Sequence, residues 1–142
     1  VAIEKRMGEI VKQARPIEKK LMPKPEVTIR DRNCNVGVIY YGANRPAVLE
    51  GLDLLERDGI RLNAMRLKAF PFGEEVRAFC AGHDRIFVVE QNRDAQLRAL
   101  LTLETAVEKK KLRSILHYNG LPMSPGTIVD GVNTALDKEV AA

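Results

Sequence analysis

Cysteine is scarce in this sequence. It contains only Cys34 and Cys80, with no CxxC pair and no histidine at ligand spacing. Zinc sites and iron–sulfur clusters need several such ligands close together, so neither is predicted for this chain alone. Two thiols without a disulfide pattern indicate a reducing, cytoplasmic compartment. Neither lies in an obviously basic stretch, and we interpret both as structural.

Long hydrophobic runs are also missing. The longest apolar runs are four to six residues, so no transmembrane helix is predicted. The chain begins with a charged amphipathic stretch, which does not resemble a signal peptide. Its first residue is Val1 and not methionine, which indicates a processed product or a fragment. A content of 45% hydrophobic and 30% charged residues is typical of one soluble globular domain.

The net charge of +4 is placed unevenly. Residues 1–32 hold nine Lys or Arg and five Asp or Glu, whereas residues 33–142 hold fourteen of each. This arm has no aromatic residue and no arginine cluster, so nucleic acid is not an expected partner. Its apolar stripe predicts a helix that ends at Pro16, followed by a proline-containing linker. We therefore expect a basic arm, 1–32, that contacts another domain or chain, and a folded domain, 33–142. The stripe consists of Ile3, Met7, Ile10, Val11 and Ala14.

From residue 36 onward, strand patterns alternate with helix patterns. The run at residues 86–89 is apolar throughout, which predicts a strand buried on both faces. The connections are long enough for helices, so neighbouring strands should be parallel. The predicted fold is α/β, with three layers: a mainly parallel sheet and helices on both faces. Strands are expected at 36–41, 60–67, 85–89 and 112–118, with a short edge strand at 27–29, and helices are expected after Pro46, Gly73, Asp94 and Ser124.

Polar residues follow two of these strands. Glu90–Asp94 comes directly after the buried strand, and Gly42–Arg45 connects the first strand to its helix. The carboxyl ends of parallel strands meet at one edge, where open α/β sheets place their ligand crevice. With Tyr118–Gly120, these segments should form one edge of the sheet. The candidate residues for an interface or an anion-binding edge are Gly42, Asn44, Arg45, Glu90, Asn92, Arg93 and Asp94.

Each of these segments has two interpretations. Backbone N–H groups at 42–45, with Arg45, could hold a phosphate or carboxylate; alternatively, Arg45 pairs with an acid across an interface. Glu90 could act as an acid or base that Asn92 orients. Alternatively, Asp94 caps the next helix, and the other polar groups bond to neighbouring loops or to another subunit.

No complete catalytic site emerges from the residues alone. The sequence has neither a GxGxxG nucleotide motif nor a GxSxG nucleophile motif. His83 follows a short predicted helix and is expected on the surface, and His117 is expected to face a neighbouring loop.

Three separated segments resemble, in the same order, the C-terminal domain of the alpha subunit of 2-oxoacid:ferredoxin oxidoreductases, in particular the 2-oxoglutarate branch. They are residues 38–47 (VIYYGANRPA), 88–98 (VVEQNRDAQLR) and 112–122 (LRSILHYNGLP). The resemblance covers about residues 33–136, and the arm is similar to the charged helix that precedes this domain. It implies a transketolase C-terminal-like fold. One departure is Ala95, where relatives commonly have a glycine that would allow a left-handed turn.

The resemblance also implies a function. Enzymes of this family use thiamine diphosphate and Mg²⁺ to decarboxylate a 2-oxoacid, pass electrons through iron–sulfur clusters to ferredoxin, and transfer the acyl group to coenzyme A. Their cofactor lies between an upstream pyrimidine-binding domain and a diphosphate-binding domain in the beta subunit. This sequence has no GDG…N diphosphate motif. The chain is therefore expected to be a scaffold and interface domain, inactive alone, without catalytic, cofactor-binding or metal-binding residues of its own.

The expected partners are the upstream domain and the beta subunit, with ferredoxin and coenzyme A reached through the complex, and neither nucleic acid nor a membrane. The alternative is a free-standing, flavodoxin-like module that binds an anionic ligand at a helix N-terminus. The exposure of Ile3, Met7 and Ile10 separates the two, because a docking arm should present an exposed apolar patch.

Overall fold

The computed structural model describes residues 2–29 and 33–140. Its core is a five-stranded sheet with the order β1-β3-β2-β4-β5. The strands β2 to β5 are parallel, and β1 pairs antiparallel with β3 at one edge. The predicted mainly parallel α/β sheet is confirmed. The strands are β1 (Glu26–Ile29), β2 (Val36–Tyr41), β3 (Asn63–Leu67), β4 (Arg85–Glu90) and β5 (Leu112–Leu116).

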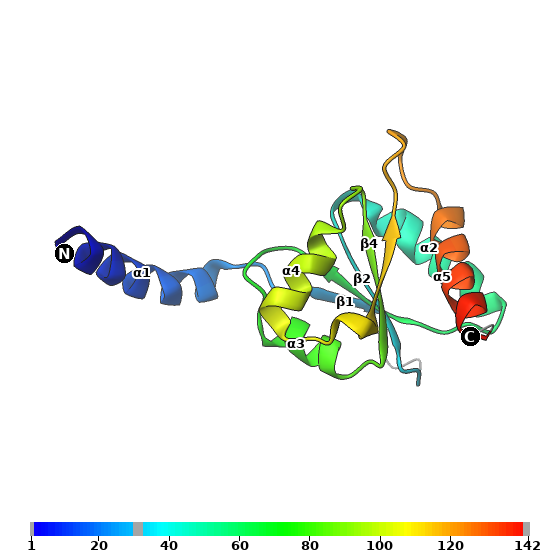
Figure 1. The fold of residues 1–142 in the computed structure, drawn as a ribbon, viewed down its shortest axis with the longest axis horizontal. Coiled ribbons are helices and arrows are strands. Elements are labelled where there is room, and N and C mark those ends of the chain that lie inside the picture. The colour runs from blue at the N-terminus through cyan, green and yellow to red at the C-terminus, as the bar shows by residue number, and fades with distance from the viewer. Residues whose placement is uncertain (1, 30–32, 141–142) are drawn as a thin grey trace.

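Helices cover both faces of the sheet (Figure 1). One face packs against α2 (Arg45–Arg57) and α5 (Pro125–Val140), and the other against α3 (Glu74–Ala81) and α4 (Gln96–Thr105). The interior strand β4 is completely buried at residues 86–89, with alternate side chains in the two cores. A strand covered by helices on both sides has no wet face and needs no polar alternation. The predicted doubly buried strand is thus confirmed.

The helices α2 and α5 approach each other closely at Gly51. A Cβ atom added there would lie 2.8 Å from the Cβ of Ile128 and 3.0 Å from the carbonyl oxygen of Pro125. Glycine therefore allows a contact that a larger residue would force apart. This contact holds α2 in place, and the N-terminus of α2 follows the candidate turn at residues 42–44.

The N-terminal helix α1 (Ala2–Leu21) projects away from the sheet (Figure 1). Ile3, Met7 and Ile10 on its predicted stripe are 79%, 61% and 57% exposed, as the docking-arm interpretation expects. The side chains of the other two stripe residues, 11 and 14, lie outside the described part of the chain. Although α1 has 20 residues, neither it nor any other described helix is apolar enough to cross a membrane.

Three predicted boundaries were wrong. The helix α1 continues five residues past Pro16. Proline removes one backbone hydrogen bond, at a cost of about 3 kcal/mol, but Lys12, four residues earlier, is exposed and its carbonyl can bond to water. The strand β3 starts at Asn63, not residue 60, because its pairing with β2 begins there, after a turn at Gly59 with φ of +84°. The strand β5 ends two residues before the predicted end.

Candidate interface at the carboxyl edge of the sheet

The carboxyl ends of the parallel strands form one edge of the sheet. The strand β2 ends at Tyr41, β4 at Glu90 and β5 at Leu116, and β4 lies between the other two in the sheet. The candidate segments 42–45, 90–94 and 118–120 therefore follow adjacent strand ends. In two of these segments, polar side chains bond to other groups of the same chain, as described below.

Glu90 is completely buried and caps helix α4. Its Oε1 accepts hydrogen bonds from the backbone N–H of Leu97 at 2.6 Å and from Nδ2 of Asn92 at 2.9 Å. Its Oε2 accepts a hydrogen bond from the backbone N–H of Arg98 at 3.1 Å. Both N–H groups lie in the first turn of α4, where they have no acceptor in the helix and where the helix dipole favours a negative charge. The carboxylate is thus committed to the fold and is not placed for acid–base chemistry.

Asn92 and Asp94 have different roles from the ones predicted. Asn92 does orient Glu90, but it orients the carboxylate for helix capping and not for acid–base chemistry. The Oδ1 of Asn92 accepts hydrogen bonds from the backbone N–H groups of Asp94 at 3.1 Å and Gln96 at 3.4 Å. The alternative in which Asp94 caps α4 was wrong. Its exposed carboxylate pairs with Nε of Arg93 at 2.8 Å. The carboxylate of Glu90 already occupies the first turn of the helix.

Ala95 precedes α4 with a left-handed backbone, φ 52° and ψ 46°. This conformation costs a residue with a Cβ atom about 1 kcal/mol or more. It is the position at which the family resemblance leads us to expect glycine. The left-handed turn is therefore kept in this chain although the glycine is not.

The turn after β2 begins at Gly42, whose φ of +65° favours glycine. Residues 42–44 form a 3₁₀ turn that ends at the buried Asn44, and Pro46 lies in the first turn of α2, as predicted. Arg45 extends toward the edge strand β1, where its Nη2 lies 3.7 Å from Oε1 of Glu26. Arg45 thus pairs with an acid of its own chain.

Two more cations lie beside Glu26. The Nζ of Lys68 is 3.2 Å from Oε2 of Glu26, and Nη2 of Arg66 donates to the carbonyl oxygen of Gly42 at 3.3 Å. The hydrogen bond from Lys68, with the charges of Lys68, Arg45 and Arg66, outweighs burial and lowers the pKa of Glu26. We call Arg45, Arg66 and Lys68 the basic cluster. Sequence reasoning missed Arg66 and Lys68, although their i, i+2 spacing at a strand end was an available signal.

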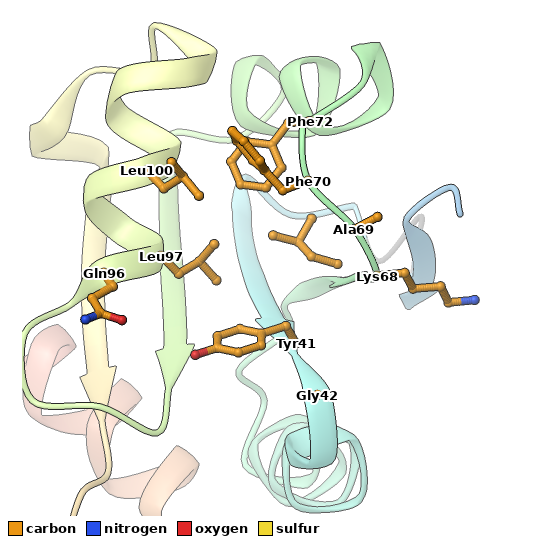
Figure 2. A pocket seen from close by; sticks show the side chains of 10 residues that line it. Tyr41, Gly42, Lys68, Ala69, Phe70, Phe72, Gln96, Leu97 and Leu100 are labelled. Carbon is orange, nitrogen blue, oxygen red and sulfur yellow. The ribbon is translucent and has the colours of Figure 1, made fainter. Parts of the chain in front are cut away.

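An apolar pocket of about 450 Å³ opens at the same edge, between the ends of β2 and β3 and helix α4 (Figure 2). The rings of Phe70 and Phe72 meet edge to face, with their centroids 5.3 Å apart. Sequence reasoning missed this pocket, although the loop after β3 carries two of the chain's four phenylalanines. The main apolar lining residues are Tyr41, Leu67, Phe70, Phe72, Leu97 and Leu100.

His83 is buried, so its predicted surface position was wrong. Its Nδ1 lies 2.7 Å from the carbonyl oxygen of Phe79, its Nε2 lies 3.1 Å from Nδ2 of Asn63, and its ring centroid is 4.2 Å from that of Phe79. Gly37 of β2 has no side chain and so leaves space for the rings of Phe79 and His83. A Cβ atom there would lie 2.8 Å from the Phe79 ring and 3.2 Å from the His83 ring. His83 packs near the amino ends of the strands, away from the candidate edge.

The other histidine and Cys80 agree with their predicted roles. His117 faces the neighbouring loop, with Nε2 2.8 Å from the carbonyl oxygen of Leu121. Cys34 and Cys80 are free thiols. Burial raises the pKa of Cys80, which disfavours the reactive thiolate. The Sγ of Cys34 lies 3.5 Å from the carbonyl oxygen of Val36.

The described residues do not fit an iron–sulfur cluster or another metal centre, and the N-terminus of α4 does not fit a diphosphate. Residues 2–29 and 33–140 contain no group of three or more His, Cys, Asp or Glu side chains placed to hold a metal. The carboxylate of Glu90 fills the N-terminus of α4, where a diphosphate would need free N–H groups.

Two curated relatives match most of this chain, whereas no family model matches it. The chain is 28% identical over 109 residues to subunit alpha of 2-oxoacid:ferredoxin oxidoreductase 2 of Aeropyrum pernix, covering 75% of this chain and 17% of that protein. It is 26% identical over 138 residues to the 2-oxoacid:ferredoxin oxidoreductase subunit alpha of Saccharolobus solfataricus, covering 95% of this chain and 22% of that protein. The chain thus spans about a fifth of the length of these relatives.

Solved structures show the same likeness. The 2-oxoglutarate:ferredoxin oxidoreductase of Magnetococcus marinus, solved with 2-oxoglutarate, coenzyme A and succinyl-CoA, superposes with a TM-score of 0.79 at 25% identity, over 94% of this chain and 23% of that one. The alpha chain of a probable 2-oxoacid ferredoxin oxidoreductase of Thermoplasma acidophilum superposes with a TM-score of 0.54 at 27% identity, over 80% of this chain and 97% of that one. A split-gene transketolase shares the fold, with a TM-score of 0.65 at 15% identity, over 80% and 42%. The chain is therefore homologous to the alpha subunits of 2-oxoacid:ferredoxin oxidoreductases and has the transketolase-like α/β fold that its motifs predict.

Proposed function

We propose that this chain is the scaffold and subunit-interface domain of a thiamine-diphosphate-dependent 2-oxoacid:ferredoxin oxidoreductase in the cytoplasm. Residues 1–32 act as an arm that docks the folded domain, residues 33–142, onto another domain or chain of the enzyme. The complete enzyme oxidatively decarboxylates 2-oxoglutarate, transfers the acyl group to coenzyme A and reduces ferredoxin through iron–sulfur clusters. The structural relative solved with 2-oxoglutarate and succinyl-CoA supports this choice of substrate. An upstream pyrimidine-binding domain and the beta subunit supply the cofactor site.

The exposed apolar stripe of α1 carries this proposal. Ile3, Met7 and Ile10 lie at helical spacing on one face of a helix that projects from the domain. Helices gain most of their stability by packing an apolar face against another surface. This face has no such surface in the described chain, which supports a partner. The internally bonded polar groups at Glu90 and Asn92 also suit a scaffold better than a catalytic site.

The proposal is tested by co-expressing the chain with the other domains of the oxidoreductase and weighing the intact complex by native mass spectrometry. The variant Ile3→Gln with Met7→Gln should lose the complex, because it removes apolar contact area. The control Lys5→Gln with Glu9→Gln changes the opposite face of α1 and leaves the net charge unchanged, so it should assemble normally. Equal assembly of both variants would contradict a docking role for the stripe.

The alternative is a free-standing module that binds an anionic ligand at Gly42–Arg45, and it requires the ligand to share Arg45 with Glu26. We would titrate inorganic phosphate into the isolated chain and follow the backbone amide signals of residues 42–45 by NMR. Saturable shifts there, in a monomer that assembles with none of the other domains, would favour the module over the scaffold.

A further inference from the structure

Two large aromatic side chains remain exposed at the mouth of the apolar pocket. Tyr41 and Phe70 are 38% and 49% exposed, and Leu97 and Leu100 of α4 form the facing wall (Figure 2). A volume of about 450 Å³ is large enough to receive a side chain with part of its backbone. Filling it removes apolar surface from water, which favours an apolar occupant.

The basic cluster borders this pocket. Lys68 is among the residues that line the pocket, and its side chain points away from the pocket to meet Glu26 of β1 (Figure 2). Gly42 also lines the pocket, and its carbonyl oxygen accepts a hydrogen bond from Arg66. Among the described residues, the cluster places three cations, Arg45, Arg66 and Lys68, around the carboxylate of Glu26. This excess of positive charge complements an occupant that carries a carboxylate next to its apolar group.

The rest of the edge narrows the choice of occupant. An acidic group cannot use the N-terminus of α4, because the carboxylate of Glu90 already binds the N–H groups of Leu97 and Arg98. The pocket wall is mainly apolar, whereas small-molecule sites usually add several placed polar groups that fix the ligand. An apolar pocket with an exposed aromatic lip and a charged border is the pattern of a protein interface.

We propose that this pocket receives an apolar side chain from a polypeptide segment of the complete oxidoreductase outside this domain, and that an Asp or Glu beside that side chain shares Lys68 and Arg45 with Glu26. The inference rests on the proposed function, since the chain spans only 17–23% of the two curated relatives and of the Magnetococcus enzyme chain. The inference also changes which part of this edge is expected to contact the partner. The apolar pocket makes that contact, and Glu90–Asp94 supports helix α4, which forms one wall of the pocket.

The test is site-specific photocrosslinking in the assembled oxidoreductase. Benzoylphenylalanine is introduced at Phe70, at Tyr41 as a second position on the pocket mouth, at Met7 on α1, and at Leu103, an exposed residue of α4 outside the pocket lining, as a control. After irradiation, the crosslinked peptides are identified by mass spectrometry. Thermal unfolding of each variant shows that the domain is folded.

We expect Phe70 or Tyr41 to crosslink to one segment that has an Asp or Glu within a few residues of the attachment point. Lys68→Met should lower the yield about three- to fivefold at low salt and less at high salt, because it removes one exposed charge contact. Crosslinks from Met7 without any from the pocket positions would overturn the inference and leave the assembly role intact. Crosslinks to a second copy of this chain or to a small molecule would also overturn it. An enzyme that assembles without this chain would refute the proposed function itself.

Discussion

The Glu90→Ala variant removes the carboxylate that caps α4. In the native chain this group accepts hydrogen bonds from the N–H groups of Leu97 and Arg98 and from the side-chain amide of Asn92, at 2.6, 3.1 and 2.9 Å. Because Glu90 is completely buried, water does not readily replace it. The variant therefore leaves three donors without their acceptor.

The size of the effect follows from these contacts. Losing a helix N-cap costs about 1 kcal/mol, and a hydrogen bond to a charged acceptor contributes about 1.5–3 kcal/mol. The variant also removes the cost of burying a negative charge, so these values do not simply add. We expect the free energy of unfolding to fall by about 3 kcal/mol. For a chain of 142 residues this lowers Tm by about 10 °C.

The measurement is urea unfolding of the isolated chain, followed by circular dichroism. The control is Asp94→Ala, which breaks only the exposed pair with Arg93 and should change the free energy of unfolding by less than about 0.5 kcal/mol. Glu90→Gln keeps the shape but turns one acceptor into a donor, so its loss should be intermediate. Equal losses for Glu90→Ala and Asp94→Ala would refute the capping argument.

Three further changes test other contacts. Ala95→Gly should raise the free energy of unfolding by about 0.5 kcal/mol, because relief of left-handed strain exceeds the entropic cost of glycine; urea unfolding measures this. Gly51→Ala should lower it by about 1 kcal/mol or more, because the new Cβ atom would lie 2.8 Å from the Cβ of Ile128. The lowered pKa of Glu26 means that its contribution to stability is complete above the ordinary glutamate pKa and is lost as pH falls through the lowered value. Lys68→Met should raise the pKa of Glu26 in a carboxyl ¹³C NMR titration.

Each of these changes has an internal control. Ala99→Gly, inside α4, should destabilise the chain by about 1 kcal/mol, and a similar loss for the residue-95 variant would contradict the strain argument. Gly8→Ala adds a Cβ atom with nothing within 4 Å, so it should not destabilise the chain; a matching loss would remove the packing explanation at residue 51. Glu108, whose pKa is lowered by Lys110, should keep its pKa in the residue-68 variant. A parallel rise would indicate a general effect and not a lost local pair.

Sequence patterns predicted the elements of the domain well, because each element depends on neighbouring residues. The apolar run at 86–89 was sufficient to predict a doubly buried strand, and the alternation of strands and helices was sufficient to predict a parallel sheet. Local rules failed where solvent or a distant residue decided the outcome. The helix α1 continues through Pro16 although proline removes a backbone hydrogen bond, and His83 is buried because Gly37 of β2 leaves room for it.

The sequence by itself determined the fold class, the family resemblance and the position of the polar strand ends, since these depend on periodicity and on short motifs. Only the tertiary structure decided what those strand ends do. Glu90 caps a helix that begins six residues later, and the basic cluster gathers side chains from β3, the residue after it and α2 around Glu26 of β1. The strand order β1-β3-β2-β4-β5 creates that neighbourhood. Local patterns do not encode which strands lie side by side, and the contacts that define this edge depend on that choice.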